Sequence, residues 1–149
     1  MIEKPVYNVE EEINLRLRTL TLIRWIAVFG QLGAIVISFY YLDFVFNVFQ
    51  AFFLILCSAV LNIIIMIRYP ITKILNFNET FYFLFYDLVQ LVLLLSLTGG
   101  LTNPFCVLIL APIVIASTYL DLKRTILIVS ISVISVTALV FLYFPFESA

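Results

Sequence analysis

The stretch that decides the fold is Thr98-Gly99-Gly100-Leu101-Thr102-Asn103-Pro104-Phe105, where two long apolar runs meet with no charged residue between them. Two adjacent glycines release the backbone from helical geometry, so a helix is predicted to end here. Asn103 is a good N-cap, and Pro104 stands where the first residue of a helix needs no N–H partner. The stretch therefore predicts a tight polar hairpin between two apolar helices.

The composition places those helices in a membrane. Hydrophobic residues make up 64% of the 149 residues and charged residues 11%, and the mean hydropathy is +1.20. A soluble domain averages about 45–50% apolar and about 25% charged residues. A globular fold of this length could not bury so much apolar surface, so its solvent must be largely lipid. The predicted fold class is an all-α, polytopic transmembrane helix bundle.

Five hydrophobic segments follow one another along the chain, at about 23–42, 46–67, 80–98, 104–120 and 126–144. Each is long enough, at about 1.5 Å per residue, to approach the ~30 Å of a hydrocarbon core. Their short connections predict antiparallel neighbours within a transmembrane domain over 23–149. Residues 1–22 hold glutamates, arginines and one apolar helical stripe of Ile13, Leu17 and Leu20, which favours a short amphipathic helix at the cytoplasmic membrane surface.

The basic residues predict the orientation of the bundle. All eight lie before or at the start of the first segment, or in the second and fourth connections: Lys4, Arg16, Arg18, Arg24, Arg68, Lys73, Lys123 and Arg124. Since Lys and Arg are enriched in cytoplasmic loops, the N-terminus is predicted to be cytoplasmic. The hairpin and the last residue are then outside.

Asp87 is the one carboxylate within a predicted span. Gln90 and Thr98 continue its helical face toward the hairpin, and Gln31, Asn62 and Ser132 are predicted at a similar depth. These residues predict an interior polar layer that hydrogen-bonds across helices. Two interpretations stay open: Asp87 is a neutral hydrogen-bond donor that joins helices, or it is a protonatable, signal-coupling site.

Several kinds of chemistry are excluded or disfavoured. The chain has no histidine, which excludes His-ligated haem, a histidine base and a phosphoaccepting histidine within it, and it has no ATP-binding motif. Cys57 and Cys106 show no metal-ligand spacing and are predicted to be small buried hydrophobic residues. No catalytic residue and no metal site are therefore predicted. Pro112 is predicted to kink the fourth helix.

The hairpin has the features of a ligand site. Backbone N–H groups at the glycines and at the start of the next helix, with the side chains of Thr102 and Asn103, can donate to an oxygen. Phe105 offers an aromatic face above apolar helix walls. A quinone has carbonyl oxygens, a flat ring and an apolar tail, and it matches these features. The candidate site comprises Gly99, Gly100, Thr102, Asn103, Pro104 and Phe105.

Residues 99–105 resemble the GGxxNPF heptapeptide of the RegB/PrrB family of redox-sensing histidine kinases, also called ActS. Further blocks in the same order are similar to that family: Leu17-Arg18-Thr19-Leu20, Arg24-Trp25, Gly30-Gln31, Asp87-Leu88, Gln90-Leu91 and Leu110-Ala111-Pro112. The similarity covers about residues 15–125.

The resemblance implies a dimeric sensor of the bacterial inner membrane with six spans, in which the heptapeptide takes part in ubiquinone sensing. It implies a kinase region after the last span and a response regulator of the RegA/PrrA type, with no direct contact between this chain and nucleic acid. The chain ends after five predicted spans, so we expect the sixth span and the kinase region to be missing from it. Two alternatives remain: a small transporter or permease module that uses the Asp87 layer, and a structural membrane subunit.

Overall fold

The computed structural model describes residues 17–41, 44–45, 48–70, 72–142 and 147–148. Its α-helices are α1 (Leu17–Tyr41), α2 (Val48–Arg68), α3 (Phe77–Leu97), α4 (Leu110–Tyr119) and α5 (Leu122–Leu142). Two 3₁₀ segments, η1 (Gly100–Thr102) and η2 (Pro104–Ile109), connect α3 to α4. The short strands β1 (Phe44–Val45) and β2 (Glu147–Ser148) pair antiparallel. The prediction of an all-α bundle is confirmed.

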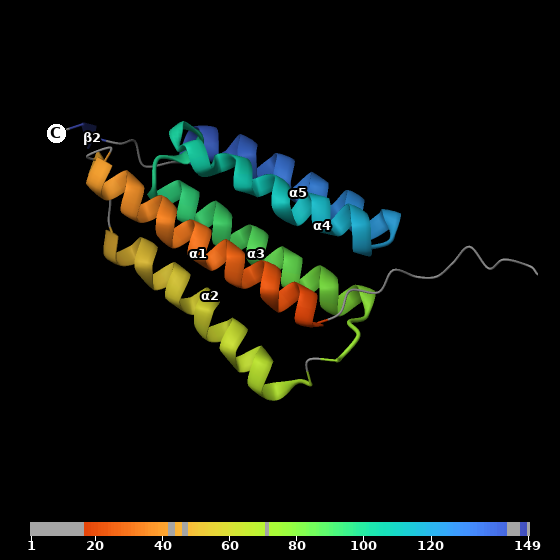
Figure 1. Cartoon of the computed structure of the whole chain (residues 1–149). Coiled ribbons are helices and arrows are strands. Elements are labelled where there is room, and N and C mark those ends of the chain that lie inside the picture. The colour runs from red at the N-terminus through yellow and green to blue at the C-terminus, as the bar shows by residue number, and fades with distance from the viewer. Residues whose placement is uncertain (1–16, 42–43, 46–47, 71, 143–146, 149) are drawn as a thin grey trace, which may run out of the picture.

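Helix α3 is the centre of the bundle. It packs against α2, α4 and α5, while α1 packs against α2. Figure 1 shows α4 and α5 side by side on one side of α3, with α1 and α2 on the other. Buried leucines of α3, among them Leu88, Leu91 and Leu95, form a core with Ile109 of η2 and Leu139 of α5.

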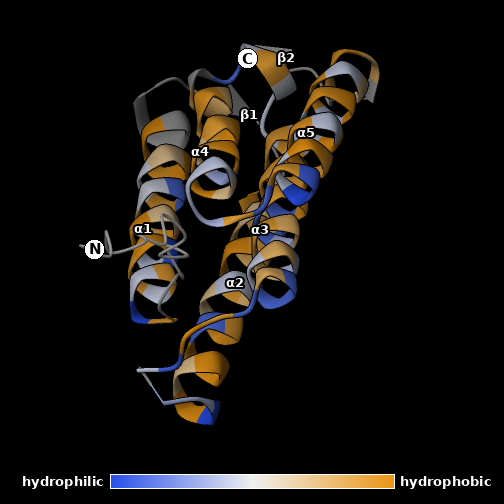
Figure 2. Ribbon diagram, turned by 90° about the vertical axis from the view of Figure 1, so that its right-hand side faces the viewer, coloured by the Kyte–Doolittle hydropathy of each residue, from blue (hydrophilic) through white to orange (hydrophobic). Residues whose placement is uncertain are grey.

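The outer surface is apolar, as a lipid solvent requires. Phe49, Ile67 and Phe141 are each about 80% exposed, and Figure 2 shows hydrophobic residues along the length of the helices. Exposed apolar surface on this scale is not compatible with water. By length and composition four helical stretches could cross a membrane: Leu17–Ile37, Val48–Arg68, Phe77–Leu97 and Leu122–Phe141. The chain is a multi-pass membrane protein.

Helix α1 begins at Leu17, about six residues before the predicted first span. The Leu17 N–H donates to the Lys73 carbonyl at 2.9 Å, which satisfies one of the free donors at the start of the helix. Leu17 and Leu20 are buried against Ile65 and Leu75. Residues 17–22 are therefore the first turns of α1, because their leucine stripe packs onto α2. The rest of the predicted surface helix, residues 1–16, lies outside the described residues.

The fourth segment is built differently from the prediction of one α-helix over 104–120. Its first six residues form η2, and the α-helix after it has ten. A 3₁₀-helix rises about 2.0 Å per residue against about 1.5 Å, so together they reach roughly 27 Å. Pro112 is the third residue of α4, where a missing N–H costs no helical bond, so no mid-helix kink is needed.

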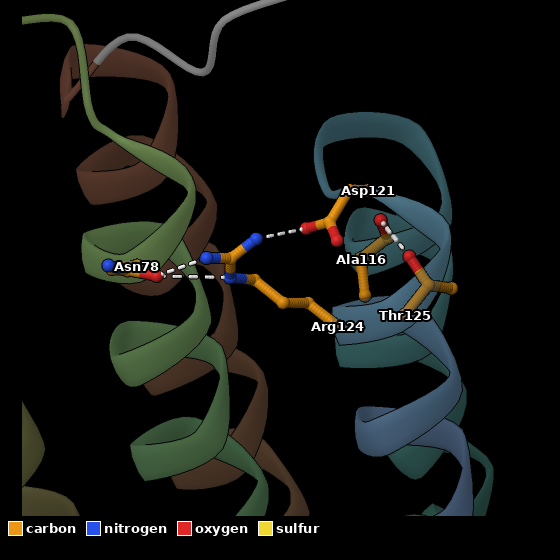
Figure 3. A network of polar contacts seen from close by, with 5 residues as sticks. All are labelled: Asn78, Ala116, Asp121, Arg124 and Thr125. Atoms are coloured by element: carbon orange, nitrogen blue, oxygen red, sulfur yellow. Dashed lines mark hydrogen bonds and ion pairs between the residues drawn. The ribbon is translucent and has the colours of Figure 1, made fainter.

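The basic end of the bundle is the end that carries the α2–α3 loop and the α4–α5 turn. Figure 3 shows Arg124 of α5 reaching Asn78 at the start of α3. The Arg124 Nε donates to Asn78 Oδ1 at 3.1 Å, Nη2 donates to the same oxygen, and Nη1 lies 2.5 Å from Asp121 Oδ1. Beside it the Thr125 hydroxyl donates to the Ala116 carbonyl at 3.0 Å. These contacts join α3 to the α4–α5 turn.

Candidate functional site at the hairpin and the polar core

The hairpin has the backbone geometry that its sequence predicts. Helix α3 ends at Leu97, and Gly99 and Gly100 have φ angles of 95° and 60°. These left-handed conformations are disfavoured for residues that carry a Cβ. The Thr102 N–H and hydroxyl then both donate to the Gly99 carbonyl, at 3.2 Å and 2.7 Å. The glycines thus turn the chain out of α3, and η1 closes the turn.

Asn103 holds the two sides of the hairpin together. It is 5% exposed, and its Oδ1 accepts from the Phe105 N–H at 2.9 Å, as predicted for an N-cap. Its Nδ2 donates to the Thr98 carbonyl at 3.0 Å and to the Thr98 Oγ1 at 2.9 Å. Both amide hydrogens and the amide oxygen are therefore used within the hairpin.

Two spaces formed by described residues lie at this end of the bundle, and they differ in size. Beneath it a cavity of about 20 Å³ is lined by Gln31, Thr98, Asn103 and Phe105, together with apolar residues of α1 and α3. Between α2 and the last turns of α3 a groove of about 480 Å³ opens to the outer surface. Its walls are Phe49, Gln50, Phe53, Leu54, Leu93, Ser96 and Leu97. Of these two spaces only the groove has the volume of a small-molecule site, and none of residues 99–105 lines it.

An intramembrane ion pair lies deeper in the bundle. The Arg24 Nε of α1 is 3.1 Å from Asp87 Oδ1 of α3, and the two side chains are 3% and 21% exposed. The guanidinium carbon lies 5.7 Å and 5.5 Å from the ring centres of Phe83 and Tyr86. Asp87 thus lies within ion-pair distance of Arg24, a partner that neither of the two interpretations named.

Arg24 is the residue that the sequence reasoning missed. The charge pattern groups it with the basic residues at the cytoplasmic flank, but α1 begins at Leu17, which places Arg24 two turns inside the helix. The available signal was Asp87 itself, because an acidic residue within a span is usually paired. Of the described basic residues, Arg24 alone lies away from the basic end.

The predicted polar layer is brought together only in part. Gln90 Nε2 donates to Gln31 Oε1 at 3.0 Å, which joins α3 to α1 beside the ion pair. Asn62 is fully buried and donates to the Thr21 carbonyl at 3.3 Å. Ser132 is buried on α5, but its hydroxyl donates to the Ile128 carbonyl one turn back. The layer is therefore a contact between α1 and α3, with Asn62 joining α2 to α1 nearby.

The polar core and the hairpin are contiguous. Gln31, Leu91 and Leu108 line both the cavity beneath the hairpin and a second cavity beside the Arg24–Asp87 pair. The predicted buried face that climbs from Asp87 toward the hairpin is present, since Gln90, Leu94 and Thr98 are all buried.

The cysteines and possible metal ligands add no further site. Cys57 is exposed on α2 and Cys106 is half-buried in η2, so neither is the fully buried residue that was predicted. In a bundle surrounded by lipid an apolar side chain is equally satisfied facing outward. Within the described ranges no group of three or more His, Cys, Asp or Glu residues could hold a metal ion.

Comparison with known proteins bears on the family. The chain is 40% identical over 130 residues to the sensor histidine kinase RegB of Cereibacter sphaeroides, which covers 87% of this chain and 28% of that kinase. A second RegB, from a named strain of the same species, is 40% identical over 76 residues, covering 51% of this chain and 16% of the kinase. No family model and no solved structure matches the chain. The chain therefore spans much less than half the length of the relatives it matches.

The apolar helices and this similarity define the class as the membrane-embedded sensor region of a histidine kinase. The family is RegB/PrrB, and the chain corresponds to its N-terminal sensor portion. The resemblance seen in the heptapeptide is confirmed.

Proposed function

We propose that this chain senses the redox state of a quinone pool, with ubiquinone as the ligand, at the hairpin end of a bacterial inner-membrane bundle. The observation that carries the proposal is the hairpin of residues 99–105, whose motif and left-handed glycines follow, about one helical turn along the chain, the α3 residues that line a groove large enough for a ring. In the whole protein the signal would pass to a kinase region and then to a response regulator of the RegA/PrrA type. The sensor would work as a homodimer.

The groove between α2 and α3 supplies the space for the ring. Phe49 and Phe53 offer aromatic faces, while Gln50 and Ser96 place polar groups in an otherwise apolar wall. Ser96 and Leu97 directly precede Thr98, so a ring in the groove is within about one helical turn of the glycines. An isoprenoid tail would lie along the exposed apolar faces of the same helices.

The hairpin would respond to the ligand by exchanging hydrogen bonds. The Thr102 hydroxyl and the Asn103 amide already bond within the hairpin. A ring oxygen that accepts a hydrogen bond from either group must displace one of these contacts, which couples ligand binding to the turn. Phe105 follows the turn directly and lines the small cavity beneath it, so it would contact the ring once the turn has opened. Oxidised and reduced quinone differ in donors and acceptors, and only a difference in affinity can shift the bundle between states.

Segment η2 is the element best suited to change shape. A 3₁₀ run of six residues is longer than usual and often marks a hinge. Its conversion to α-helix would shorten it by about 0.5 Å per residue, or roughly 3 Å in all. Since η2 contacts α3, and α4 contacts both α3 and α5, such a movement would reach the basic end.

Photo-crosslinking with a quinone analogue tests the site. Labelling should be lower in the Phe53→Ala and Asn103→Ala variants than in the wild type. The first substitution removes a ring contact, and the second removes the hydrogen bonds that hold the hairpin. Phe141→Ala is the control, since Phe141 is also a lipid-exposed phenylalanine but lies on α5 and does not line the groove. Equal labelling of all four proteins would overturn the proposal.

A further inference from the structure

A partly polar cavity of about 60 Å³ adjoins the Arg24–Asp87 pair. Residues of α1, α2, α3, η2 and α4 line it, and five of them are polar or charged: Arg24, Gln31, Ser58, Asp87 and Gln90. The remaining walls are apolar. The quinone proposal does not use this space.

The buried Arg24 guanidinium has hydrogen-bond donors that no acceptor among the described residues satisfies. Its side chain is 3% exposed, and its Nε, Nη1 and Nη2 have no hydrogen-bond acceptor among the described residues, although Nε lies within ion-pair distance of Asp87. Asp87 contacts the guanidinium at Nε, and the rings of Phe83 and Tyr86 lie near it. A buried cationic donor without an acceptor is costly. The cavity is where an acceptor for these nitrogens can lie.

The size and charge of the cavity restrict its occupant. The guanidinium and the carboxylate cancel each other, so the site does not select an anion. A cavity that admits benzene measures ~150 Å³, so a quinone ring does not fit, whereas one water needs only about 10–15 Å³. We propose that the cavity binds a cluster of roughly two to four water molecules, which accept from Arg24 Nη1 and Nη2 and connect them to the Gln31 and Gln90 amides.

Magnetisation transfer from water, measured by solid-state NMR on the ¹⁵N-labelled chain in lipid bilayers, tests this directly. Signals of the Arg24 Nη groups should receive magnetisation from water although Arg24 lies inside the bundle. Absence of transfer from water to the Arg24 Nη groups in the wild-type protein would overturn the proposal.

Two valine variants at buried serines locate the water. Ser58→Val fills the cavity from α2 and should abolish the transfer to Arg24. Ser132→Val is the matched control, since Ser132 is equally buried but does not line the cavity, and it should keep the transfer. Transfer that persists in a folded Ser58→Val protein would place the water elsewhere and contradict the proposal. A shift of the Arg24 Nη signals on exchange of chloride for nitrate would identify an anion and would also overturn it.

Discussion

Arg24 and Asp87 join α1 to α3 through an ion pair with Nε 3.1 Å from Oδ1, inside a bundle whose walls are otherwise mostly apolar. Because each charge has its partner on the other helix, the pair restricts both the rotation and the sliding of α1 against α3. The hydrogen bond between Gln31 and Gln90 adds a second polar contact between α1 and α3, about two turns further along α1.

Removing one member of this pair should cost more than removing both. Arg24→Met or Asp87→Leu leaves the other charge buried and unpaired, and each should lower the free energy of unfolding by about 3–5 kcal/mol. The double variant should recover most of that loss. The measurement is unfolding by steric trapping in lipid bicelles.

Arg18→Met serves as the control for loss of a basic residue, because Arg18 is exposed at the start of α1. It should change the free energy of unfolding by less than about 1 kcal/mol. Single variants as stable as wild type would mean that the pair is not formed in the membrane.

The two kinds of glycine should respond oppositely to alanine. Gly99→Ala places a Cβ at a φ of 95° and should cost about 1–2 kcal/mol. Gly30→Ala lies within α1, where a Cβ meets nothing within 4 Å, and should stabilise the helix by about 0.5–1 kcal/mol. The same unfolding assay compares them. An unchanged free energy of unfolding in Gly99→Ala would contradict the left-handed conformation of Gly99.

Asn103→Ala should destabilise the hairpin by about 2 kcal/mol, since it removes the cap of η2 and two bonds to Thr98. Asn103→Asp keeps the acceptor for the Phe105 N–H but loses both donors, so its effect should be intermediate. Hydrogen exchange at the Phe105 amide is the local measurement. Exchange in Asn103→Ala no faster than in wild type would show that the amide does not hold the turn.

Much of the fold was predictable because lipid imposes simple rules. The helices α2, α3 and α5 follow from apolar runs of sufficient length, and the hairpin follows from two glycines, Asn103 and Pro104. These signals are local, so they can be read from the chain alone.

The sequence did not show what depends on packing. The pattern of basic residues places Arg24 at the flank of the first span, because hydropathy does not reveal that the helix begins at Leu17 and brings this arginine to Asp87. Segment η2 could not be distinguished from an α-helix by composition. The proposed ligand groove forms only where α2 packs against α3, and no local pattern in the sequence predicts that packing.

The contact between Asp121 and Arg124 predicts a pH effect at the basic end. The hydrogen bond from Arg124 lowers the pKa of the Asp121 carboxyl from its ordinary value of 3.8. A lowered native pKa means that the folded state binds fewer protons than the unfolded state. The contact therefore contributes stability above about pH 4, and this is lost as the pH falls through the lower native pKa.

Carboxyl ¹³C titration by NMR checks this assignment. In Arg124→Gln the pKa of Asp121 should rise toward 3.8, while Lys123→Gln, which removes the neighbouring charge, should leave it nearly unchanged. An Asp121 pKa that is the same in wild type and Arg124→Gln would contradict the contact.

The central claim is that this bundle distinguishes two redox states of a quinone, and equilibrium binding tests it most directly. The dissociation constants of oxidised and reduced short-chain ubiquinone should be measured for the chain in lipid nanodiscs. A coupling of about 1–3 kcal/mol corresponds to a ratio of about 5–150 between the two constants. We predict a ratio in that range that falls toward one in Phe53→Ala and Asn103→Ala and is retained in Phe141→Ala. Equal constants in the wild-type protein would contradict the account, because a ligand that binds both states equally shifts nothing.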